Sequence, residues 1–166
     1  LAPQSTETEK YLIGFLVLEG ELDELQAFLS DALAKAAPKD RGPMMYQYQQ
    51  FLSSSKEKGQ AFRVMEKVAA PYLDVAEAHI ALSLMAFSNK DNARAEAEAK
   101  EALRLKPDSE LAVLTLAQAE ADPVRSIQTL TEFLILKEVP ERSRGAYFQC
   151  AHADRTKGIR PCETRV

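Results

Sequence analysis

The sequence has no tryptophan, only two cysteines and only six glycines among its 166 residues. The two cysteines, Cys150 and Cys162, both lie near the C-terminal end, which is not the pattern of a disulfide framework, and whether they pair stays open. With His152 they make only three metal ligands, at a spacing that matches no zinc motif, so we expect no metal site and no cofactor. Scarce glycine beside abundant alanine, leucine, glutamate and lysine is typical of an all-α chain.

An excess of basic residues is also missing. The formal net charge is -4 and the sequence pI is about 5.3. Because nucleic-acid binders carry a basic surface, we expect no nucleic-acid partner. The apolar run YLIGFLVL, from Tyr11 to Leu18, is far shorter than the roughly 20 residues that span a bilayer, and no basic segment precedes it. We therefore expect a buried helix there, with no transmembrane segment.

Motifs for several classes of enzyme are absent. The chain has no G-x-x-x-x-G-K-[ST] loop, no G-x-G-x-x-G and no H-E-x-x-H, so nothing supports phosphate, dinucleotide or zinc-protease chemistry. Acidic residues such as Glu96, Glu98 and Glu101 alternate with basic ones, which predicts a solvated helix face with weak i,i+4 pairs. His79 lies on an apolar face without a suitably spaced partner, so we expect a packed side chain rather than a base. The protein is therefore predicted not to be an enzyme.

The most regular stretch runs from Ala76 to Ser109 and predicts two helices and a stop. The first carries an apolar stripe at helical spacing up to Ser88: Ile80, Leu84 and Phe87. A polar turn, SNKDN, separates it from a second helix. One face of that second helix is small and apolar: Ala95, Ala99, Ala102 and Leu103. Pro107 then ends it, since proline cannot continue the helical ladder.

This stretch resembles the tetratricopeptide repeat (TPR), whose 34-residue pattern is W-x2-L-G-x2-Y, then A-x3-F, then P. The pattern falls on His79, Leu82, Ser83, Ala86, Ala95, Ala99 and Pro107. His79, Ala86 and Ala99 are smaller than the usual family residues, so the repeat is degenerate. The resemblance implies a right-handed superhelical solenoid of antiparallel helix hairpins.

A second set of positions repeats this register 34 residues earlier. Three predicted packing residues lie at that offset from Ala95, Ala99 and Ala102: Ala61, Met65 and Val68. We predict one domain over 1–153, with repeats at roughly 6–39, 42–75, 76–109 and 110–140 and a partial helix at 141–153. Residues 154–166 are predicted to be an irregular tail.

Single residues mark several of the expected helix boundaries. Pro43 suits the first position of the third helix, after the turn APKDRGP. Asp108 or Ser109 can cap the helix after Pro107, which we expect to run to Ala121. A further helix is expected to start at Asp122-Pro123.

In the TPR family the first helices of the hairpins line a concave surface that binds a partner peptide or helix. Residues of these helices at 34-residue offsets form three rows: Tyr46, Ile80 and Leu114; Gln50, Leu84 and Gln118; Ser53, Phe87 and Ala121. Such rows suit a segment with apolar anchors whose backbone is hydrogen-bonded by the two glutamines. They hold no lysine, arginine or asparagine, which disfavours clamping of a C-terminal carboxylate. Two alternatives stay open: the apolar members are core, or the chain's own C-terminal helix fills the groove.

The function expected from this resemblance is a non-enzymatic scaffold or adaptor that binds a partner protein or peptide. The alternative is a structural or self-associating segment of a larger repeat protein. A chain that starts without methionine and ends on half a repeat is expected to be a mature form or a piece of a longer array, as in large bacterial repeat proteins. We expect a location in the bacterial periplasm or envelope, with the cytoplasm as the alternative.

Overall fold

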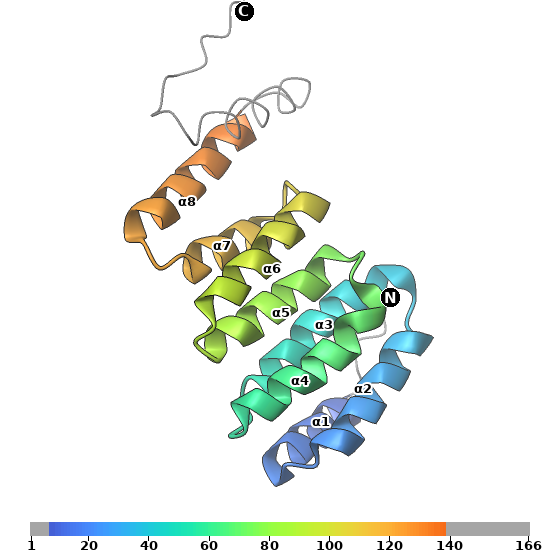
Figure 1. Cartoon of the computed structure of the whole chain (residues 1–166). Coiled ribbons are helices and arrows are strands. Elements are labelled where there is room, and N and C mark those ends of the chain that lie inside the picture. The colour runs from blue at the N-terminus through green and yellow to red at the C-terminus, as the bar shows by residue number, and fades with distance from the viewer. Residues whose placement is uncertain (1–6, 139–166) are drawn as a thin grey trace, which may run out of the picture.

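The computed structural model describes residues 7–138, and this part of the chain forms eight α-helices, one short 3-10 helix and no strand (Figure 1). In chain order the helices are α1 (Glu7–Glu19), α2 (Leu22–Lys35), α3 (Pro38–Leu52), α4 (Lys58–Ala69), η1 (Ala70–Tyr72), α5 (Ala76–Ser88), α6 (Asn92–Leu105), α7 (Glu110–Ala119) and α8 (Pro123–Glu138). The prediction of an all-α chain is confirmed for these residues. The expected helix at 141–153, the tail, His152 and both cysteines lie outside them.

The helices stack side by side in chain order, with α1 and α8 at opposite ends of the array (Figure 1). The first helix of each pair packs on the first helix of the next, so that α1, α3, α5 and α7 form a continuous series. Helix α2 packs on α4 in the same way. Helix α5 lies at the centre, in contact with α3, α4, α6 and α7. The series α3, α5 and α7 therefore presents one surface made of three adjacent helices.

Leucines at every fourth position of α2 form a fully buried stripe: Leu25, Leu29 and Leu33. They join Met45 and Leu52 of α3 and Met65 of α4 in one core. The spacing of four places all three leucines on one face of the helix. The α1–α4 half of the array is thus held together by large aliphatic side chains.

The α5–α6 pair is packed differently, through small residues. The alanines that the sequence placed on one face of α6 are completely buried: Ala95, Ala99 and Ala102. The Ser83 hydroxyl on α5 is also buried, and it donates a hydrogen bond to the Ala95 carbonyl oxygen at 2.6 Å. Side chains this small let two helix backbones approach closely, which is why a serine hydroxyl on one helix reaches a main-chain carbonyl on the other.

Helix α3 begins earlier than the sequence pattern indicated. Its first residue is Pro38, and Pro43 lies inside the helix, so the predicted start at Pro43 is wrong. Pro38 fits the first helical position because its φ is preset and its missing N–H has no intrahelical partner there. Pro43 then removes one bond of the ladder near this end. At Gly42, beside it, a Cβ would lie 3.0 Å from the Glu77 side chain, which would have to shift to accommodate it.

Polar caps set two of the later boundaries. The predicted cap Ser109 accepts a hydrogen bond from the Ala112 N–H, and α7 follows it. Asp122 accepts one from the Val124 N–H at 2.9 Å, at the start of α8. Helix α7 ends at Ala119, so Ala121 lies in the turn rather than on the helix.

Helix α1 is only half buried, which corrects the expectation of a buried helix from Tyr11 to Leu18. Its inward face holds Ile13, Leu16 and Val17, whereas the opposite face is exposed: Tyr11, Leu12, Phe15 and Leu18. The reason is its place at the end of the array, where it packs mainly against α2 and α3. Within residues 7–138, no helix combines the length and the apolar character needed to cross a bilayer.

Candidate functional site

The predicted groove residues fall on the adjacent helices α3, α5 and α7, except Ser53 and Ala121, which lie just beyond helix ends. They differ sharply in exposure. Gln50, Leu114 and Gln118 are exposed, with Leu114 at 56%, although it is a large aliphatic residue. The half-buried members are Tyr46, Ser53, Leu84 and Phe87. The structure therefore divides the predicted set into an outer and a supporting group.

Ile80 is the one member that the structure removes from the surface. It is 1% exposed and packs with Ala102 of α6 and Ala112 of α7, which are both fully buried. Both alanines leave room that the branched isoleucine fills, so a partner cannot contact it. Its assignment to the binding surface is thus corrected to core.

Tyr46 and Leu84 pack over this buried cluster from the solvent side. Both are half-buried, and Leu111 of α7 and Leu103 of α6 contact the same cluster. The cluster thus brings a tyrosine of α3 together with a leucine of α5. These two side chains form the apolar floor of the surface, on which a partner side chain could be buried without rearranging the core.

Phe87 and Ser53, which belong to the third predicted row, make contacts within the fold. Phe87 packs beside Phe62 against a cluster of alanines: Ala86, Ala95 and Ala119. The Ser53 hydroxyl accepts a hydrogen bond from the Gln49 amide at 2.7 Å and contacts the Met85 sulfur at 3.4 Å. The Ser53 hydroxyl therefore already has partners within the fold, whereas Gln50, one turn before it, is exposed.

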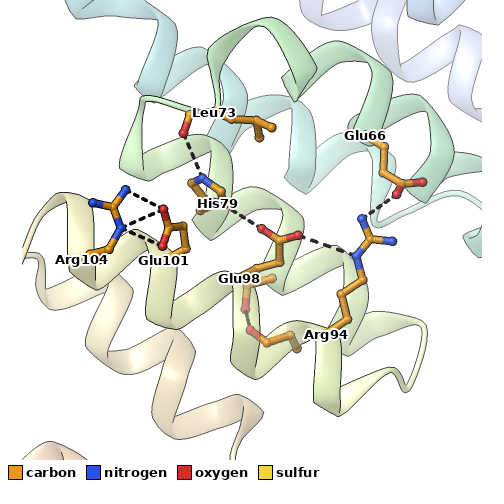
Figure 2. A network of polar contacts seen from close by, with 9 residues as sticks. Glu66, Leu73, His79, Arg94, Glu98, Glu101 and Arg104 are labelled. Atoms are coloured by element: carbon orange, nitrogen blue, oxygen red, sulfur yellow. Dashed lines mark hydrogen bonds and ion pairs between the residues drawn. The ribbon is translucent and has the colours of Figure 1, made fainter. Parts of the chain in front are cut away.

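A polar network lies between α4, α5 and α6, and its main contact was missed by sequence reasoning (Figure 2). His79 is buried, and its Nδ1 lies 2.7 Å from the Glu98 carboxylate. Its Nε2 lies 3.0 Å from the Leu73 carbonyl oxygen. Glu98 had been predicted to face solvent, yet its position three residues after Ala95 puts it at the edge of the buried stripe. The spacing of three residues between Ala95 and Glu98 is therefore the sequence signal that could have predicted a contact between Glu98 and His79.

The contacts of His79 join α5 to α6 and to the turn before α5. Both ring nitrogens of His79 lie within hydrogen-bond distance of an acceptor, the Glu98 carboxylate for Nδ1 and the Leu73 carbonyl oxygen for Nε2. The expectation of a packed histidine agrees with this geometry. Among the described residues, no group of three or more histidine, cysteine, aspartate or glutamate side chains is placed to hold a metal ion.

Two further ionic contacts tie neighbouring hairpins together. Arg94 of α6 donates to Glu66 of α4 at 2.6 Å (Figure 2). Its guanidinium carbon also lies over the Phe62 ring, 4.6 Å from the ring centroid. Glu96 accepts hydrogen bonds from Lys100 at 2.6 Å and from Arg125 of α8 at 2.8 Å. These bonds, first that from Lys100, hold the pKa of Glu96 below its usual value. Charges thus connect the outer surfaces of adjacent hairpins, away from the uncharged rows.

Comparison with protein-family models, with curated protein sequences and with solved structures gives no significant match. The interpretation of the surface on α3, α5 and α7 therefore rests on its geometry and chemistry.

Proposed function

We propose that the chain is a TPR-like solenoid that acts as a non-enzymatic interaction scaffold. Its binding surface runs over the first helices α3, α5 and α7 and takes a partner peptide or helix. The residues that contact the partner are Tyr46, Gln50, Leu84, Leu114 and Gln118, with Phe87 and Ser53 supporting the floor.

The single observation that carries the proposal is the exposure of Leu114 on α7, in the same series of packed helices as Tyr46 of α3 and Leu84 of α5. Half-buried Tyr46 and Leu84 pack on the same buried cluster as Leu111 of α7, and the exposed Leu114 lies one turn after Leu111 on that helix. Isolated exposed apolar residues are common, but such groups on packed neighbouring helices are typical of binding sites. The burial of Ala95, Ala99 and Ala102, with the bond from Ser83 to Ala95, supports the TPR register of the central hairpin.

The chemistry of these residues defines the partner. Gln50 and Gln118 flank the apolar floor, and each side-chain amide both donates and accepts hydrogen bonds, as a peptide backbone requires. No row residue carries a charge, so the partner needs no complementary charge at its centre. A segment with one or two apolar anchors, in extended or helical form, fits this surface best.

The proposal is tested by selecting peptides that bind the protein from a displayed random library and by measuring their dissociation constants by fluorescence anisotropy. Replacing Leu114 with alanine removes an exposed anchor without disturbing the core. We expect it to weaken binding about tenfold, because truncating a side chain that a partner buries costs on the order of 1–3 kcal/mol.

Leu134 of α8 is the matched control, since it is also a leucine and is 63% exposed on a different helix. Leu134→Ala should leave the dissociation constant unchanged. Selected peptides whose affinity falls equally in both variants, or in neither, would place the binding surface elsewhere.

A further inference from the structure

The exposed face of α1 is a second apolar surface, separate from the rows on α3, α5 and α7. Tyr11, Phe15 and Leu18 follow one another at spacings of four and three, so they form one stripe along the helix, and Leu12 widens it. All four are exposed; Tyr11 is the most exposed, at 74%. Several large apolar side chains gathered on one helix face are expected to be covered by another molecule or segment.

Carboxylates stand at both ends of this stripe. Glu7 precedes Tyr11 by four residues and Glu19 follows Phe15 by four, so both lie on the same helix face as the apolar side chains. Over residues 7–24 the chain carries six acidic residues and one basic residue, a net charge of -5. This acidic frame disfavours an anionic membrane surface and favours a partner that is both apolar and basic.

The chain itself contains a segment of that chemistry. Residues 139–166 carry six basic and three acidic residues, a net charge of +3, although the whole chain has a net charge of -4. Two arginines, Arg142 and Arg144, come shortly before two aromatic residues, Tyr147 and Phe148. The two aromatic side chains can pack on the α1 stripe, and the two guanidinium groups can pair with Glu7 and Glu19 at the ends of that stripe.

We propose that the α1 stripe binds the basic segment 139–166 of a second copy of this chain. Helices α1 and α8 lie at opposite ends of the described array (Figure 1). A chain's own segment would therefore have to be ordered along the length of the array to reach α1, at a cost in conformational entropy. The segment of a second copy can meet the stripe without spanning the array, at the translational and rotational cost of association, and the result is a head-to-tail contact. This contact does not depend on the peptide surface proposed above.

Sedimentation equilibrium of the 166-residue chain, from low to high micromolar concentration, tests the proposal. The wild type should associate with rising concentration, and less so at high salt, because the contact pairs opposite charges. Phe15→Gln/Leu18→Gln should raise the dissociation constant at least about tenfold. Arg142→Gln/Arg144→Gln should weaken association and reduce its dependence on salt. Both residues changed on α1 are exposed, so circular dichroism should stay that of the wild type.

Ile127→Gln/Leu134→Gln on α8 is the matched control, because it replaces two equally exposed apolar residues outside the stripe. It should leave association unchanged. The proposal is overturned if the control weakens association as much as the α1 variant does, or if the α1 variant associates like the wild type. A monomer at every concentration also overturns it. In that case, faster hydrogen exchange of α1 in the arginine variant would assign the contact to the chain's own segment.

Discussion

Glu98 is predicted to be the most important charged residue for stability, through its contact with His79. Glu98→Ala removes the carboxylate 2.7 Å from Nδ1 and leaves a largely buried imidazole with one partner, the Leu73 carbonyl. Hydrogen bonds to charged groups contribute about 1.5–3 kcal/mol. The contact of Glu98 with Arg94 is longer, 3.7 Å, and partly exposed, so it adds little. We expect the free energy of unfolding to fall by about 1.5–3 kcal/mol.

Glu101→Ala is the matched control for this substitution. Glu101 lies on the same helix, one turn later, and is paired with Arg104 at the surface. The intrinsic helix propensity changes equally in the two variants, so it cancels in the comparison. Urea unfolding followed by circular dichroism should give Glu101→Ala a midpoint close to the wild type and Glu98→Ala a clearly lower one, with the same slope.

A double-mutant cycle decides whether the loss comes from the His79–Glu98 contact itself. The variants Glu98→Ala and His79→Ala should together cost less than the sum of their separate effects, with a coupling of about 0.5–3 kcal/mol. A coupling of zero would refute the reasoning, because Glu98 would then stabilise the fold through other contacts.

Three further predictions concern packing and pH. Ala99→Leu should lower the free energy of unfolding by about 1–3 kcal/mol through overpacking, whereas Ala97→Leu, exposed on the same helix, should be close to wild type in the same urea experiment. The lowered pKa of Glu96 in the folded state means that its contribution is present above its ordinary value of 4.5 and is lost as pH falls through the folded value. Glu96→Gln should therefore flatten the acid limb of the stability profile measured by urea unfolding. Burial, and secondarily Glu9, raise the pKa of Tyr48 to about 12. The free energy of unfolding should consequently fall as pH rises from 10 towards 12. Tyr48→Phe should remove that fall, which is measured by unfolding beside the phenolate absorbance of the wild type.

Helix positions and the small-residue face could be predicted from the sequence because they depend on local spacing. The offset of 34 residues identified Ala61 and Ala95 as equivalent packing positions, and both are fully buried. The start of α3 was missed because Pro38 and Pro43 both suit a first helical position, and the choice depends on tertiary packing around Gly42 against α5.

Burial of particular side chains could not be predicted, because it depends on which helices are neighbours. Ile80 and Leu114 occupy equivalent positions 34 residues apart, yet one is 1% and the other 56% exposed. Ile80 is covered by residues of α6 and α7. Leu114 lies on α7, and among the described residues no further hairpin's first helix follows α7 to cover it. Likewise Glu98 is indistinguishable by residue type from its solvated neighbours until His79 lies opposite it.

The central claim is that a partner segment binds across α3, α5 and α7. Amide chemical-shift mapping of the labelled protein, titrated with a peptide selected for binding, tests this most directly. The account predicts that the largest changes cluster around Gln50, Leu84, Leu114 and Gln118, with α1 and α8 unaffected. Changes confined to α1, to α8 or to the α6 surface around Glu96 would contradict it.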